Sequence, residues 1–245
     1  GQRVLVRSVQ ADEPNEQGVS CVTLGSEYDG GFAEYCKVPD KQALKIISDW
    51  TDIELASVPC AFSTAEGMLQ RASVGAETVL ISGASGGVGS AAVQLAKRRG
   101  ATVIALASAS KAASVKDIGA DRVLDRDADL LDELGECSVD VVADLVVGDQ
   151  WPDFLKVLKR GGRYVTSGAI AGPLVELDLR TLYLKDLTFY GSTYQPDKVF
   201  EDLVTYIERN EVKPLVSASF ELKDIALAQE AFLAKQYAGK LVLVP

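Results

Sequence analysis

The chain has 245 residues, of which 47% are hydrophobic and 24% charged, as is typical of a soluble globular protein with one large or two modest domains. Its formal net charge of -10 at pH 7 would repel nucleic acid and anionic lipid. The sequence contains no apolar run of about 18 residues, the length that a transmembrane helix requires. The sequence has four cysteines, whose spacing matches neither a disulfide framework nor a zinc knuckle; they are Cys21, Cys36, Cys60 and Cys137. Because such cysteines suit a reducing compartment, we expect a cytoplasmic protein.

The amino-terminal residues 1–60 are predicted to consist of strands and loops. The candidate elements are a strand at residues 3–6, a polar, turn-rich stretch at 11–18 and a strand at 32–38. Thr51 and Glu54 have the spacing of a capping box. This spacing predicts a helix that begins after Thr51 and continues through Cys60.

Residues 77–100 have the pattern strand, glycine turn, helix. Residues 78–81 form an unbroken apolar run, as expected of a parallel strand covered on both faces, and residues 88–97 have apolar side chains at helical spacing. Glycines between them would let a pyrophosphate approach the backbone at the positive end of the helix. The residues expected to bind it are Ser85, Gly86, Gly87 and Val88. Ala84 stands where the G-x-G-x-x-G fingerprint has its first glycine.

Strands and helices alternate after the glycine turn. Strands are predicted at 102–106, 122–124, 139–147, 163–167 and 187–190, and helices at 111–118 and 152–158. This order predicts an α/β fold with a doubly wound parallel sheet, here a dinucleotide-binding domain at residues 61–205. Strands at 215–220 and 240–244 around a helix at 225–234 are expected to rejoin residues 1–60. The acidic run at 125–136 is interpreted as a solvated loop and helix face.

Five motifs occur in an order typical of one superfamily. They are DGGFAEY at 29–35, PCAFSTA at 59–65, GASGGVG followed by QLAK, GAD at 119–121, and GK at 239–240. With them the chain resembles the zinc-type alcohol dehydrogenase and quinone oxidoreductase branches of the medium-chain dehydrogenase/reductase superfamily. The resemblance implies a Rossmann domain at 61–205 and a partial GroES-like β domain formed by 1–60 and 206–245. Because the chain starts at Gly1 and contains no histidine, we expect a fragment whose missing part carries any imidazole chemistry.

The resemblance leaves the question of zinc open. Cys60 matches a thiolate ligand of the catalytic zinc in the zinc-type members, where the metal polarises a carbonyl or alcohol oxygen. The zinc-free quinone reductases have an apolar residue there, so Cys60 could equally be a small buried hydrophobic residue. One thiolate without its companion ligands would not hold catalytic zinc. We therefore expect zinc only in the full-length protein.

The same resemblance implies which residues contact the nicotinamide half of the cofactor. Thr64 would touch the nicotinamide ring. The other residues implied on that side of the cleft are Val147, Gly148, Ala169, Ile170, Ser192 and Lys240.

The choice of cofactor is expected to depend on Ser108, which stands 19 residues after Gly89 at the end of the second predicted strand. An Asp or Glu there would bind the ribose 2′-hydroxyl of NAD. Serine does not repel a 2′-phosphate, and Lys111 and Arg126 lie near it in sequence or at matching family positions. We therefore expect NADP rather than NAD, although Lys111 and Arg126 could also be ordinary surface charges.

These residues together predict an NADP(H)-dependent oxidoreductase that transfers hydride between nicotinamide and a carbonyl, alcohol or enone. One alternative is a zinc-free quinone or enone reductase. Another is an NADP(H)-binding module without turnover. Residues 187–190 are expected to be an edge strand, and superfamily members commonly dimerise there, so we predict a homodimer. We expect the fragment alone to be inactive.

Overall fold

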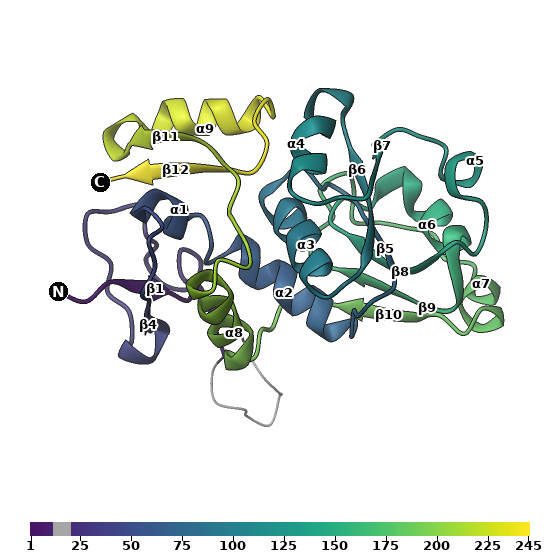
Figure 1. Ribbon diagram of the computed structural model, residues 1–245, viewed down its shortest axis with the longest axis horizontal. Helices are drawn as coiled ribbons and strands as arrows, with labels where there is room; N and C mark the ends of the chain where they lie inside the picture. Colours follow the sequence, from purple (N-terminus) through teal and green to yellow (C-terminus); the bar gives the residue numbers. More distant parts are fainter. Residues whose placement is uncertain (12–20) are drawn as a thin grey trace. The chain divides into compact units, whose positions relative to one another are not determined.

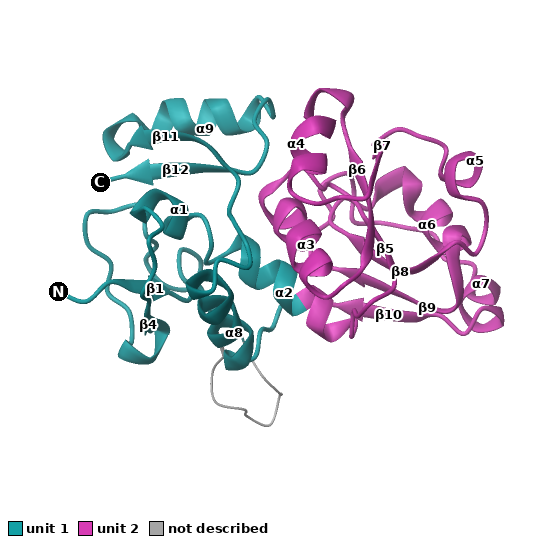
Figure 2. Ribbon diagram, viewed as in Figure 1, with its two compact units in different colours: residues 1–67, 193–245 teal, residues 68–192 magenta. Residues whose placement is uncertain are grey.

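The computed structural model describes residues 1–11 and 21–245, which form two compact units (Figures 1 and 2). Unit 1 contains residues 1–67 and 193–245, and unit 2 contains residues 68–192. The carboxyl-terminal residues thus rejoin the amino-terminal ones, and α2 (Ala61–Arg71) begins in unit 1 and ends in unit 2. The polar stretch predicted at 11–18 lies, from residue 12 onward, outside the described residues. No helix of the described part is long and apolar enough to cross a membrane.

Unit 2 is built on a six-stranded sheet with the order β10-β9-β8-β5-β6-β7, in which every pairing is parallel. The strands are β5 (Thr78–Ile81), β6 (Thr102–Ala107), β7 (Arg122–Asp125), β8 (Val139–Asp144), β9 (Leu158–Thr166) and β10 (Thr188–Gly191). From β5 the chain builds outward through β6 and β7, then returns to build β8, β9 and β10 on the other side (Figure 1). This confirms the predicted doubly wound α/β fold.

Helices cover this sheet because each strand connection crosses over it. The helices of unit 2 are α3 (Gly87–Arg98), α4 (Ala112–Asp117), α5 (Leu130–Leu134), α6 (Trp151–Val157) and α7 (Leu179–Leu184). α3 packs on β5 and β6, whereas α6 packs on β9. Right-handed crossovers that progress in opposite directions place their helices on opposite faces. Successive residues of β5 are therefore buried, and Val79, Leu80 and Ile81 have no exposed surface.

Unit 1 consists of short strand pairs and three helices in addition to the start of α2, all within the described residues. Its antiparallel pairs are β1 (Val4–Val6) with β4 (Ala43–Lys45) and β2 (Val9–Ala11) with β3 (Cys21–Thr23); its parallel pair is β11 (Val216–Glu221) with β12 (Lys240–Val244). Its helices are α1 (Asp52–Ala56), α8 (Asp197–Glu208) and α9 (Ile225–Leu233). α1 contacts both β11 and β12, so the two ends of the chain share one fold unit.

Two predicted elements of unit 1 are wrong. Residues 32–38 form no strand; they find no pairing partner, and the Tyr35 side chain is 89% exposed. The capping box at Thr51 is confirmed, since Thr51 Oγ1 accepts from Glu54 N at 3.2 Å and Glu54 Oε2 accepts from Thr51 N at 2.8 Å. The helix nevertheless ends at Ala56 and does not reach Cys60, because Pro59 disfavours helical geometry in the residue before it.

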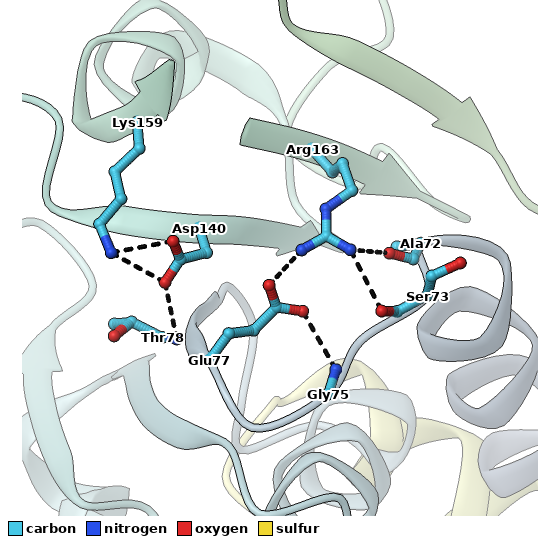
Figure 3. Close-up of polar contacts among 8 residues, drawn as sticks. All are labelled: Ala72, Ser73, Gly75, Glu77, Thr78, Asp140, Lys159 and Arg163. Carbon is cyan, nitrogen blue, oxygen red and sulfur yellow. Dashed lines mark hydrogen bonds and ion pairs between the residues drawn. The ribbon is translucent and has the colours of Figure 1, made fainter. Parts of the chain in front are cut away.

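An ionic cluster ties the amino ends of the central strands to the end of α2 (Figure 3). The Arg163 guanidinium on β9 pairs with Glu77 and donates to the carbonyls of Ala72 at 2.6 Å and Ser73 at 3.1 Å. These carbonyls follow the last turn of α2, where acceptors lack helical partners. Arg163 therefore anchors the end of α2 to the sheet.

Asp140 on β8 makes a second ionic contact in the same region (Figure 3). Both of its oxygens lie 2.9 Å from Lys159 Nζ, and Oδ2 also accepts from Thr78 N at 2.9 Å. Burial raises the pKa of Asp140, but Lys159 and the Thr78 N–H outweigh this effect and hold the pKa below its ordinary value. The charged form of Asp140 is therefore favoured by folding.

We expect Asp140→Asn to change how stability depends on pH. Because the pKa of Asp140 is lower in the folded chain than in the unfolded one, its charged form adds to the free energy of unfolding at pH values above the unfolded pKa of about 3.9. This contribution is lost as the pH falls through the pKa of the folded chain. The variant should lose about 1 kcal/mol or less at pH 7, because Lys159 is partly solvated, and should lose less stability on acidification than wild type. Urea unfolding at pH 7 and pH 3 measures both effects.

Asp153→Asn is the matched control for this experiment. It removes an exposed ion pair with Lys156 on α6, without a hydrogen-bonded strand amide, and should leave the pH profile nearly unchanged. If the free energy of unfolding fell by the same amount in Asp140→Asn and in wild type between pH 7 and pH 3, the stabilising role of the Asp140 charge would be contradicted.

Candidate functional site

The site predicted in unit 2 lies at the carboxyl edge of its parallel sheet. In doubly wound sheets, ligands bind at this edge where the strand order reverses, here between β5 and β8. The predicted residues follow the strands as follows: Ser85, Gly86, Gly87 and Val88 after β5; Ser108 and Lys111 after β6; Arg126 after β7; Val147 and Gly148 after β8; Ala169 and Ile170 after β9; and Ser192 after β10. The topology therefore brings all of them to one edge of one sheet.

Gly89 and Gly86 have different roles in the glycine turn. A Cβ at Gly89 would lie 2.1 Å from the carbonyl oxygen of Gly83, so the close packing of α3 against the turn requires glycine. A Cβ at Gly86 would approach the described residues no closer than 3.4 Å, and the backbone there is extended, with φ -78° and ψ 173°. The fold would tolerate a side chain at Gly86. Its absence instead leaves space in which a ligand can approach the backbone.

The amino terminus of α3 fits an anionic ligand. The helix begins at Gly87 with Gly86 as its N-cap, and no side chain of the described residues caps it. Ala84 N donates to Leu106 O at 3.1 Å, which holds the turn against the end of β6. The first-turn amides and the positive end of the helix dipole together suit a pyrophosphate. The residues present therefore fit the dinucleotide predicted from the sequence.

The residues expected to select the cofactor lie at the ends of two adjacent strands. Arg126 N donates to Ala107 O at 3.1 Å, so Arg126 lies beside the end of β6, where Ser108 begins the next turn. Its Nε lies 3.3 Å from Asp127 Oδ2, and the two side chains are 70% and 80% exposed. Arg126 could therefore turn toward a 2′-phosphate only by giving up a weak surface ion pair.

A buried polar cluster at this edge was missed by the sequence analysis. Asp144, the last residue of β8, has no exposed surface. Its Oδ1 accepts from Ser82 Oγ and from the amides of Val146 at 2.9 Å and Val147 at 3.1 Å, while its Oδ2 accepts from Tyr164 Oη at 2.5 Å. Ser82 Oγ in turn accepts from Leu145 N at 2.8 Å. The cluster thus joins the ends of β5, β8 and β9.

The loop that this cluster holds has an unusual backbone. Val147 has φ 61° and ψ -135°, a region that β-branched residues rarely adopt and that costs about 1–3 kcal/mol. Gly148 follows with φ 72°. Val147 forms a bridge with Gly172, and Ala171 N donates to Val146 O at 2.9 Å. The surrounding hydrogen bonds therefore impose this conformation on two residues expected to line the nicotinamide.

A sequence signal for this cluster was available. Asp144 is a carboxylate at the end of the apolar run VDVVAD, and Ser82 follows the apolar residues 78–81. A charge at the end of a strand buried on both faces needs several hydrogen-bond donors. Only the fold, however, identifies Ser82 and Tyr164 as those donors.

Three predicted residues belong to unit 1 and are described separately. Cys60 is exposed and lies directly before α2, where its carbonyl accepts from Thr64 N at 3.1 Å. Thr64 Oγ1 accepts from Gln195 Nε2 at 3.4 Å, a long contact. Lys240 begins β12, and its backbone N donates to Leu215 O at 2.8 Å. Their roles toward a cofactor stay predictions.

The described residues do not fit a zinc site. In residues 1–11 and 21–245, no group of three or more His, Cys, Asp or Glu residues could hold a metal ion. Cys60 alone offers one thiolate where a catalytic zinc needs three protein ligands. The reaction steps below therefore involve no metal.

The fold and the glycine turn define an α/β protein of the dinucleotide-binding class. Comparison with known proteins narrows this class, because the family model for zinc-binding dehydrogenases matches residues 87–209. The chain belongs to this family, within the medium-chain dehydrogenase/reductase superfamily, as its motifs predicted.

Three similar proteins illustrate the relationship. A crystal structure from Sinorhizobium meliloti 1021, provisionally assigned as an alcohol dehydrogenase, is 47% identical with a TM-score of 0.92, over 100% of this chain and 70% of that one. Acryloyl-coenzyme A reductase of Metallosphaera sedula is 32% identical over 89% of this chain, and an NAD-dependent alcohol dehydrogenase of Saccharolobus solfataricus is 29% identical over 91%. The chain spans 66% of the length of each of these two relatives.

Proposed function

We propose that this chain binds NADP(H) at the carboxyl edge of the unit 2 sheet, as part of an oxidoreductase that transfers hydride between nicotinamide and a carbonyl or alcohol. The observation that carries the proposal is the glycine turn. There Gly89 serves the packing of α3, while Gly86 leaves open a space that the fold itself does not need. Membership in a family of dehydrogenases supports the reaction class.

Different residues along the carboxyl edge of the sheet would bind different parts of the cofactor. The N–H groups at Gly87 and Val88 would bind the pyrophosphate, since they lie at the uncapped start of α3. The Gly86 N–H already donates to Gly83 O at 3.0 Å, so Gly86 would contribute space and not a donor. Lys111 and Arg126 would bind a 2′-phosphate on the β6 and β7 side. The loops after β8 and β9 would line the nicotinamide, with Thr64 and Lys240 still predictions for the same half. The bound cofactor supplies the hydride, and the protein supplies orientation and electrostatics.

A zinc-free enone reductase is the second candidate. It is supported by the similarity to a relative named acryloyl-coenzyme A reductase. Hydride would then add to the β-carbon of a conjugated thioester or ketone instead of to a carbonyl carbon. Oxidation of NADPH by the full-length protein with an aldehyde, a quinone or an enoyl thioester separates these reactions. A binding module without turnover would bind NADPH and oxidise it with none of the three.

The proposed pyrophosphate site is tested by Gly86→Val. We expect a folded variant, with stability within about 1 kcal/mol of wild type, because a side chain there has room and the extended backbone suits valine. NADPH affinity should fall at least about tenfold, since the added methyl groups occupy the space of the ligand. NADPH fluorescence titration and thermal unfolding measure the two effects.

Gly89→Ala is the contrasting variant in this experiment. Its Cβ would meet the Gly83 carbonyl, so it should lose about 1–3 kcal/mol of stability or fail to fold. Unchanged NADPH binding by folded Gly86→Val would show that the pyrophosphate lies elsewhere.

The preference for NADP is tested at Ser108. Charge-assisted hydrogen bonds to a 2′-phosphate are each worth about 1.5–3 kcal/mol, but Arg126 is exposed and paired with Asp127, so we expect only about a tenfold preference over NAD. Ser108→Asp should reverse it by repelling the phosphate. Titrations with both cofactors measure the ratio, which should shrink with salt because exposed charges are screened beyond about 8 Å at 0.15 M.

Thr102→Asp adds the same charge at the exposed first residue of β6, the opposite end of the strand that Ser108 follows, and should leave the ratio unchanged. Equal affinities of the wild type for NADP and NAD would refute this assignment. Full retention of the NADP preference by Ser108→Asp would refute it as well.

We also propose a two-fold homodimer that forms through β10. This strand is the edge of the unit 2 sheet, and an edge has unpaired backbone groups. Exposed apolar side chains precede it in sequence; they are Ile170, Leu174, Val175, Leu179, Tyr183 and Leu184. Such a concentration of exposed apolar residues is typical of an interface.

Light scattering at micromolar concentration should give twice the 26.1 kDa mass of one chain. Leu174→Asp, at a side chain that is 93% exposed, should shift the mass toward one chain, whereas Leu227→Asp on α9 should not. A monomeric wild type would contradict the proposal.

A further inference from the structure

We propose that Asp144 is a positioning residue for the nicotinamide half of the cofactor, because its carboxylate holds the main chain of residues 145–148 in the shape that receives it. The inference rests on the proposed function and adds a residue that would touch neither cofactor nor substrate. It is carried by the hydrogen bonds of a fully buried carboxylate at the switch point of the sheet.

The surroundings of Asp144 require a carboxylate. Four donors converge on its two oxygens: the hydroxyls of Ser82 and Tyr164 and the amides of Val146 and Val147. An ionised carboxyl group only accepts hydrogen bonds, so all four contacts are made at once, and its charge strengthens each. Burial, followed by the charge of Asp144, raises the pKa of Tyr164 well above its usual range, so its hydroxyl stays protonated and donates.

The same contacts connect the loop at residues 145–148, after β8, with the glycine turn after β5. Ser82 directly precedes the glycine turn, and its Oγ binds both Asp144 and Leu145 N. A Cβ at Gly83 would lie only 3.1 Å from Val146 Cγ2, so the turn and the loop are in direct contact. Asp144 therefore fixes the distance between the part of the edge that would bind the pyrophosphate and the part that would bind the nicotinamide.

Stability alone gives a weak reason for this carboxylate. A buried charge pays a desolvation cost that well-packed apolar residues of similar volume avoid, and its neighbours in β8, Val142 and Ala143, are apolar and fully buried. The arrangement instead holds Val147 at φ 61° through an amide bond to Oδ1. Backbone conformations of this kind persist where the surrounding structure enforces them, and they cluster at ligand-binding sites.

The test compares two ligands on Asp144→Asn. An amide in place of the carboxylate presents an NH₂ group to a set of donors, so the loop should lose its shape. NADPH reaches the loop after β8, whereas adenosine 2′,5′-bisphosphate carries only the adenosine half of the cofactor. We expect NADPH affinity to fall about tenfold or more, and bisphosphate affinity to stay within about twofold of wild type. The fluorescence of bound NADPH should also shift toward that of free NADPH.

Asp140→Asn is the matched control, because it makes the same substitution on the same strand at the other end (Figure 3). It should leave both affinities unchanged. Tyr164→Phe keeps the aromatic ring, whose centroid lies 4.8 Å from that of the Trp151 ring, and removes only one hydrogen-bond donor to Asp144. It should therefore show a smaller loss of affinity, confined to NADPH. This second variant keeps the test decisive if Asp144→Asn does not fold.

The outcomes separate the two proposals. If the wild type binds NADPH, two results would overturn the positioning role of Asp144. One is an equal loss of affinity for both ligands in Tyr164→Phe or in folded Asp144→Asn. The other is no loss of affinity in either variant. A wild type that bound neither ligand would overturn the proposed function, and the role of Asp144 with it.

Discussion

The close contact between Gly89 and the Gly83 carbonyl is the constraint on which the binding edge depends. Only a residue without a Cβ allows α3 to begin so near the end of β5. This contact brings the uncapped first turn of the helix to the carboxyl edge of the sheet, beside the place where the strand order reverses. The free amides and the space left at Gly86 follow from that placement. Stability at Gly89 and binding at Gly86 are thus separate functions of one turn.

The two ends of the central strands use charge in different ways. At the amino end, Asp140 meets Lys159, and Arg163 meets Glu77 and two carbonyls beyond the last turn of α2 (Figure 3). These partly solvated pairs join elements and need no ligand. At the carboxyl end, Asp144 is completely buried and has only neutral hydrogen-bond donors in the contacts described. β8 therefore carries one carboxylate that contributes to stability and another whose contacts shape a loop.

The sequence predicted the elements whose signal is local. The apolar run at 78–81 became β5 with the same bounds, and the glycine at 100 follows α3 with φ 82°. The strand predicted at 163–167 begins at Leu158 instead, because Leu158 pairs with Val139 of β8 before an irregularity in the register that contains Gly161 and Gly162. α8 was missed, and residues 32–38 lack the partner that a strand requires. Pairing partners and the donors around Asp144 come from distant segments, which periodicity cannot show.

The central claim is that the first-turn amides of α3 bind the cofactor pyrophosphate. Two-dimensional amide NMR of the isotopically labelled chain, titrated with NADPH, tests it most directly. The account predicts that the largest shift changes fall on the amides of Gly87 and Val88, with smaller ones at Val147 and Gly148. Saturable binding that left the amides of Gly87 and Val88 unchanged would contradict it.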